Sequence, residues 1–300
     1  MIRFAVLALI LLLAGCSSND APGPAAPSDA PWFQRLSTSP EPEVAPRFSP
    51  DGTQLVYERA GSLRLLDLGS GTSRPLVAQG NHPSWTRDNS AVVFARRDVA
   101  PAGLIHRLMR VAVATGALDT LSADSVDAYD PAASPASAAI ALRQLSRVSR
   151  LQTLRVVDGS GTTVEVLAEA GTYVDTSPAW SKDGASIAFV RLDTSGAGRL
   201  MIVPANGSRA AGPLNAAGDV VADPAWAPGG RIVYARAGTI SWIEPGGAAP
   251  HVLVEGDGFE LSPVLSPDGT RLVFTTDRTG NRELWMLVDP NGIGDGPYRY

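Results

Sequence analysis

The chain has 300 residues, 44% of them hydrophobic, and its 25 Lys and Arg against 30 Asp and Glu give a net charge of −5. An acidic chain without a basic run lacks the positive footprint of nucleic-acid binding and the polybasic patch of a lipid-binding surface. Because Cys16 is its only cysteine, an intramolecular disulfide is excluded and stability must come from packing.

The N-terminus is typical of an exported protein. After Arg3, the stretch from Phe4 to Leu13 is an unbroken apolar run. A membrane-spanning helix needs roughly 20 apolar residues, so this run is too short to span but has the length of a signal-peptide core. The ending Leu13-Ala14-Gly15-Cys16 resembles the bacterial lipobox. That resemblance implies a signal peptide over 1–15 and a lipidated Cys16; the alternative is an ordinary secreted protein with a stray cysteine.

The expected mature N-terminus is a lipid anchor followed by a tether over residues 16–31. Two or more acyl chains on Cys16 give stable anchoring, since each buried methylene contributes about 0.8 kcal/mol. The tether is made mostly of small and polar residues and has little to bury. Ser17 stands where an Asp would favour inner-membrane retention, so the resemblance implies the outer membrane, facing the periplasm.

A five-residue motif recurs along the rest of the chain. Successive copies start 37, 48, 47, 46 and 39 residues apart, which is the size of one propeller blade. The copies are Phe48-Ser-Pro-Asp-Gly52, Trp85-Thr-Arg-Asp-Asn89, a decayed Ala133-Ser-Pro-Ala-Ser137, Trp180-Ser-Lys-Asp-Gly184, Trp226-Ala-Pro-Gly-Gly230 and Leu265-Ser-Pro-Asp-Gly269.

The motif has the chemistry of a tight turn between two strands. Proline presets φ, Asp accepts local hydrogen bonds, and Gly or Asn adopts the positive φ that ends the turn. Two further apolar strands follow each copy, so six units of four strands are predicted over 32–300. We therefore expect an all-β, six-bladed propeller of antiparallel blades, in which the N-terminal segment from Trp32 to Ser37 completes the last blade.

At these motifs the chain resembles the TolB-like propeller repeat, and the resemblance extends over all six units. It implies the fold but not the function, because such propellers include binding proteins and enzymes. The family's periplasmic member TolB binds a peptidoglycan-associated lipoprotein. This chain departs from TolB in its predicted lipid anchor, and we expect no separate N-terminal α/β domain before the propeller.

Several chemistry-bearing residues have a simpler structural explanation. The turn acids Asp51, Asp88, Asp183 and Asp268 recur with the turn and are expected to cap it. Trp85, Trp180 and Trp226 share the position of Phe48 and are expected to pack between blades. The histidines His82, His106 and His251 are dispersed, which predicts surface or loop positions and no metal site. No Gly-x-Ser-x-Gly elbow occurs.

Five acids near the start of the inner strands are the candidate site. Three stand three residues before the strand's proline (Glu43, Asp175, Glu260), and two stand directly before it (Asp130, Asp223). Because inner strands line the central channel, these acids are predicted to form a ring at one mouth. Such a ring would bind a partner or attract a cation such as Ca²⁺; the alternative is that the acids only keep the mouth solvated.

The sequence favours a lipid-anchored, monomeric, non-catalytic binding or scaffolding module of the cell envelope. Its expected contacts are the membrane, through Cys16, and another envelope protein, with no nucleic acid, cofactor, metal ion or catalytic residue. The alternative is a carbohydrate-active or other hydrolytic or lyase enzyme that uses the acidic channel mouth.

Overall fold

The computed structural model describes residues 31–100, 103–169, 173–215, 219–247 and 249–300. The predicted signal peptide, the lipidated Cys16 and nearly all of the tether lie outside these residues. All described secondary structure is β-strand, and no described residue belongs to a helix that could cross a membrane.

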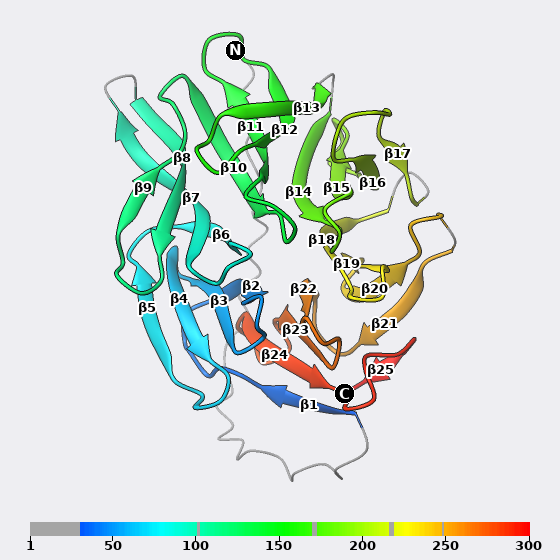
Figure 1. Cartoon of the computed structure of the whole chain (residues 1–300). Helices are drawn as coiled ribbons and strands as arrows, with labels where there is room; N and C mark the ends of the chain where they lie inside the picture. The colour runs from blue at the N-terminus through cyan, green and yellow to red at the C-terminus, as the bar shows by residue number, and fades with distance from the viewer. Residues whose placement is uncertain (1–30, 101–102, 170–172, 216–218, 248) are drawn as a thin grey trace.

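Six antiparallel sheets surround a central axis, which confirms the predicted six-bladed propeller (Figure 1). Blades one and two contain β2 (Glu43–Phe48), β3 (Gln54–Arg59), β4 (Ser62–Asp67), β5 (Ser73–Val77), β6 (Asn81–Trp85), β7 (Ala91–Ala100), β8 (Gly103–Ala112) and β9 (Leu118–Thr120). Blades three and four contain β10 (Val126–Ala133), β11 (Ile140–Ser146), β12 (Gln152–Val157), β13 (Thr163–Glu169), β14 (Val174–Trp180), β15 (Ser186–Leu192), β16 (Gly198–Pro204) and β17 (Gly212–Pro213). Blades five and six contain β18 (Val221–Trp226), β19 (Ile232–Arg236), β20 (Thr239–Ile243), β21 (His251–Glu255), β22 (Glu260–Leu265), β23 (Arg271–Thr276), β24 (Glu283–Val288) and β1 (Trp32–Arg35).

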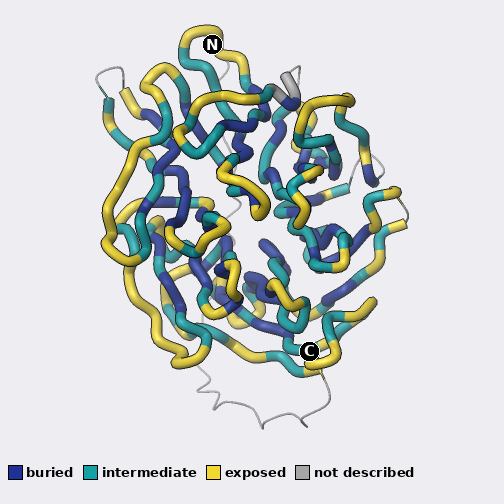
Figure 2. The backbone as a smooth tube through the Cα atoms, viewed as in Figure 1, coloured by how far each residue is buried: buried dark blue, intermediate teal, exposed yellow. Residues whose placement is uncertain are grey.

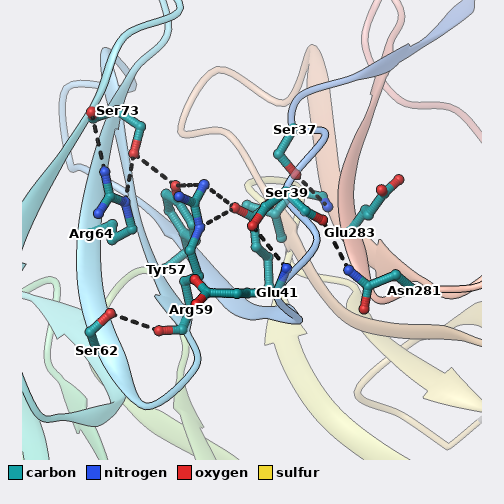
Figure 3. Close-up of polar contacts among 12 residues, drawn as sticks. Ser37, Ser39, Glu41, Tyr57, Arg59, Ser62, Arg64, Ser73, Asn281 and Glu283 are labelled. Atoms are coloured by element: carbon teal, nitrogen blue, oxygen red, sulfur yellow. Dashed lines mark hydrogen bonds and ion pairs between the residues drawn. The ribbon is translucent and has the colours of Figure 1, made fainter.

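The N-terminal strand closes the ring, as predicted. β1 pairs antiparallel with β24, from Trp32 opposite Val288 to Arg35 opposite Trp285. The chain then crosses from blade six to blade one, where the Asn281 amide donates to the Ser39 carbonyl at 3.0 Å (Figure 3). One strand was not predicted: β25 (Tyr298–Arg299) pairs parallel with β21 as a fifth strand of blade five.

The turn acids cap their turns. In blade one, the Ser49 hydroxyl donates to Asp51 at 2.6 Å, and the backbone N–H of Thr53 donates to the same oxygen at 3.0 Å. Gly52 takes the positive φ of 71° that the turn requires. Asp88, Asp183 and Asp268 make the same contacts. The expectation of a structural role for these acids is confirmed.

The core lies between neighbouring blades, where Figure 2 shows the inner strands buried and the outer edges exposed. One cluster joins Val56 and Leu63 of blade one to Trp85 and Phe94 of blade two. The indole N–H groups of Trp85, Trp180 and Trp226 donate across to carbonyls of the preceding blade at 2.9–3.2 Å. These tryptophans therefore pack between blades, as expected.

Candidate functional site

Each inner strand contains a bulge at the residue before its proline. These residues are non-glycine, yet all have a left-handed φ between 49° and 52°, and the strand pairing shifts there in every blade; they are Ala45, His82, Asp130, Ser177, Asp223 and Ser262. Such conformations cost on the order of 1–3 kcal/mol each and concentrate at functional sites. The six residues, which we call the channel ring, all line one cavity.

The cavity occupies the mouth of the central channel on the side of the Ser-Pro-Asp-Gly turns. Its volume is about 630 Å³, enough for a small-molecule ligand. Charged and polar groups on its wall include His82, Asp130 and Asp223 of the channel ring, together with Glu58. Trp85, Trp180 and Trp226, whose indole N–H groups bind neighbouring blades, also contribute to the wall.

His82 and Asp130 form a pair across blades two and three. Nδ1 of His82 lies 3.3 Å from Oδ1 of Asp130, and the two side chains are 50% and 7% exposed. The other carboxylate oxygen of Asp130 accepts hydrogen bonds from Arg143 at 3.1 Å and from Thr176 at 2.6 Å. Burial alone raises the pKa of Asp130, but Arg143, His82 and Thr176 outweigh it and lower that pKa. The carboxylate therefore stays ionised beside the imidazole.

Glu58 is the second carboxyl near His82, and its environment acts in the opposite direction. Burial raises the pKa of Glu58, and the charge and backbone N–H of His82 offset only part of that effect. One cavity thus contains a carboxylate that stays charged and a carboxyl group that keeps its proton to higher pH. Divergent pKa shifts of this kind are the pattern from which acid and base roles are assigned.

The predicted ring of five acids does not form. Asp130 and Asp223 line the cavity, whereas Glu43, Asp175 and Glu260 are buried and do not. Each of these three lies opposite a residue of the second strand of its own blade. Glu43 therefore pairs with Arg59, Asp175 pairs with Arg191 at 2.7 Å, and Glu260 accepts from Thr276 at 3.2 Å. These contacts link the first and second strands of one blade, at the end of the inner strand away from the turn.

The other two histidines lie outside the cavity. His106 is in strand β8, not in a loop as expected, with Nδ1 3.8 Å from Asp127, and burial lowers its pKa. His251 lies in β21 and stacks on Trp242 with ring centroids 4.4 Å apart. Of the three histidines, His82 lines the cavity.

Sequence reasoning missed His82 as a channel residue. It was judged as one of three dispersed histidines, although it stands directly before Pro83 as Asp130 stands before Pro131. Comparing that position across all six repeats would have found the channel ring. Glu58 had no such signal, because its side chain reaches the cavity from the second strand, opposite Val44.

Comparisons with known proteins place this geometry among propellers. No protein-family model matches the chain. A curated relative, the TolB homolog of Chlorobium luteolum, is 33% identical over 118 residues, which are 38% of this chain and 26% of that protein. The match therefore spans about a quarter of the relative's length.

The chain has the fold of the TolB-like propellers, and part of it matches a TolB homolog.

Two solved structures of the same architecture are enzymes by description. A gluconolactonase from Xanthomonas campestris superimposes with a TM-score of 0.67 and 14% identity, covering 91% of this chain and 99% of the other. An oligogalacturonate lyase from Vibrio parahaemolyticus gives a TM-score of 0.60 and 13% identity, covering 86% and 81%. At these identities the likeness shows the propeller fold alone.

These neighbours contradict the expectation of a non-catalytic scaffold. That expectation rested on the missing Gly-x-Ser-x-Gly elbow and on the three dispersed histidines. Propellers of this shape include proteins described as lyases and gluconolactonases, so the fold gives no ground for excluding catalysis.

One neighbour, an oligogalacturonate lyase in complex with manganese, raises the question of a metal ion. The described residues contain no group of three His, Cys, Asp or Glu able to hold one. Both oxygens of Asp130 are already occupied, and Asp223 accepts a hydrogen bond from Ser262 at 2.7 Å. The donor set of this channel does not fit a divalent ion, and no metal enters the mechanism below.

Proposed function

We propose that this protein is a carbohydrate-active enzyme, a lyase or hydrolase, whose active site is the cavity at the channel mouth. The observation that supports it most directly is the contact between His82 and the buried, ionised Asp130 on the cavity wall. The sugar chemistry comes from the enzymatic neighbours of the same fold.

In the proposed mechanism, His82 moves the proton. With Nδ1 turned to Asp130, Nε2 is the nitrogen left to accept a proton from a bound sugar or from water. Asp130 orients the imidazole, while Arg143 and Thr176 hold the carboxylate in place. Glu58, which retains its proton to higher pH, is the proposed donor to the leaving oxygen.

The proposal is tested by turnover assays of the purified full chain. We would use a panel of oligogalacturonates, sugar lactones and nitrophenyl glycosides, and then compare wild type with His82→Ala. A positioned acid or base contributes roughly 10²–10⁴-fold, so the variant should lose at least a hundredfold in kcat.

The matched control is His251→Ala, which removes a histidine that stacks on Trp242 outside the cavity. Turnover should survive this change. If the whole panel is inert to wild type, or if both histidine variants lose activity equally, the enzymatic proposal is wrong.

We also propose a place in the cell envelope, with which the partial match to a TolB homolog is consistent. Attachment through a lipid on Cys16, to the outer membrane, is the finer part of this proposal. Labelling cells with an alkynyl fatty acid tests it: wild type should carry the label and Cys16→Ser should not. Equal labelling of the two would contradict the anchor. The envelope partner and the monomeric state stay predictions.

A further inference from the structure

The channel cavity carries more positive than negative side chains, although the chain as a whole is acidic. Four cations line it (Arg47, Arg87, Lys182, Arg282) against three acids (Glu58, Asp130, Asp223). Lys182 is the only lysine among the 300 residues. The net charge of the chain is −5, whereas the side chains that line this cavity carry more positive than negative groups.

The cavity acids do not form ion pairs with these cations. Asp130 is engaged by His82, Arg143 and Thr176, and Asp223 accepts from Ser262. The raised pKa of Glu58 favours its neutral form. Among the described residues, no Asp or Glu lies within 4.0 Å of a nitrogen of the four cations. Their charge is therefore available to a ligand.

Arg47 is the best placed of the four. It belongs to inner strand β2, two residues after the left-handed Ala45, and is half-buried in the cavity wall. Its guanidinium donates to the Pro46 carbonyl at 2.8 Å, and its own carbonyl accepts from the Trp85 indole at 3.2 Å. Burial lowers the pKa of the Arg47 guanidinium, and the charge of Asp223, which forms no ion pair with it, offsets only part of that effect. A strand of the sheet thus holds a cation that, within the described part of the chain, has no carboxylate oxygen within 4.0 Å.

We infer that Arg47 binds the carboxylate of an acidic sugar in this cavity, and that Lys182, Arg87 and Arg282 supply the supporting positive field. A guanidinium matches a carboxylate with two parallel hydrogen bonds, which a single ammonium cannot do. The inference rests on the proposed function, since it names the substrate class of the same cavity. In this proposal the positive charge that binds the anion comes from an arginine side chain and not from a metal ion.

The test is calorimetric titration of the full chain in EDTA with two matched probes, trigalacturonate and galactotriose. They share the sugar ring but differ in the carboxylate. We expect wild type to bind trigalacturonate and to bind galactotriose at least tenfold more weakly. Arg47→Gln should weaken trigalacturonate binding by roughly tenfold to a hundredfold, the usual effect of losing a charged hydrogen-bond pair.

Arg47→Lys separates charge from geometry and should recover part of the affinity. Arg64→Gln is the control and should bind as wild type does; Arg64 belongs to the third strand of blade one, β4, and contacts Ser73 (Figure 3). Melting temperatures establish that each variant is folded. Should Arg47→Gln itself melt unfolded, the comparison of Arg47→Lys with wild type decides: unchanged affinity would overturn the inference.

Equal affinity for both sugars, binding of neither, loss of binding in EDTA, or equal binding of a triglutamate peptide would also overturn the inference. Its failure is distinguishable from that of the proposed function. If His82→Ala abolishes turnover while Arg47→Gln leaves binding intact, only the carboxylate site is wrong. If Arg47→Gln abolishes binding while wild type turns over no sugar of the panel, the anion site stands and the enzymatic proposal is wrong.

Discussion

The channel ring shows how one backbone position can serve two purposes. The residue before each inner-strand proline is forced into a left-handed conformation, which interrupts strand pairing and places that residue on the wall of the cavity. Blades one, four and six have Ala45, Ser177 and Ser262 there, and blades two, three and five have His82, Asp130 and Asp223. His and Asp tolerate left-handed φ better than most residues, so chemistry and backbone preference agree at these three positions.

Glu58 gives a prediction at the residue scale. Its pKa is raised in the folded protein, so folding favours its protonated form, and the carboxylate costs stability once the pH rises above the ordinary value of 4.5. Glu58→Gln should therefore raise the melting temperature at pH 7, by roughly 1–3 °C, while lowering turnover. The gain should shrink as the pH falls below 4.5, where the wild-type side chain is also neutral.

Thermal melts of wild type and Glu58→Gln between pH 4 and pH 8 measure this difference. Glu41→Gln, a change at an exposed glutamate outside the cavity, is the control. A variant that is less stable than wild type at pH 7, or a difference that does not depend on pH, would contradict the assignment.

At the scale of the element, the ring depends on a strand from the other end of the chain. β1 supplies the outer edge of blade six through pairing with β24, and Phe33 packs against Phe274 and Tyr300 with centroids 6.3 and 4.3 Å apart. Removing β1 would leave β24 as an unpaired edge and expose apolar surface.

Deleting residues 32–38 should therefore lower the melting temperature by roughly 10 °C or more. The control deletion, residues 17–30, removes no described strand and should have little effect. Calorimetric melts of the two truncations decide the matter. Equal melting of both would show that the N-terminal strand does not hold the ring closed.

The repeat predicted the fold at this scale because each copy of the motif forms its turn through local residue preferences. A turn motif at blade-sized spacing fixes which strands are neighbours, and the segment before the first motif occupies the place of a fourth strand. β25 could not be predicted in the same way, since its pairing with β21 depends on where the last turns carry the chain.

At the scale of the whole molecule, the site was predicted only in part. Asp130 and Asp223 were recognised because the motif's proline marks their position. Glu43, Asp175 and Glu260 were placed with them because acids three residues earlier also start inner strands. The bulge separates the two groups, however, and turns the second group toward Arg59, Arg191 and Thr276. Alternation along a regular strand does not predict such a shift.

The function was predicted least well, because it depends on side chains from several blades. The sequence contains no continuous catalytic motif such as Gly-x-Ser-x-Gly, and we therefore predicted a non-catalytic protein. The cavity assembles its histidine, its two kinds of carboxyl group and its cations from separate repeats, so only the closed ring reveals them together.

The central claim is that substrate binds in the channel cavity beside His82 and Asp130. The most direct measurement is a crystal structure of the His82→Ala variant with the sugar that wild type turns over best, because the inactive variant should retain it intact. The account predicts sugar density in the channel mouth, with a ligand atom within about 3 Å of the Glu58 carboxyl and another at Arg47. Sugar density on an outer blade edge, with an empty channel, would contradict it.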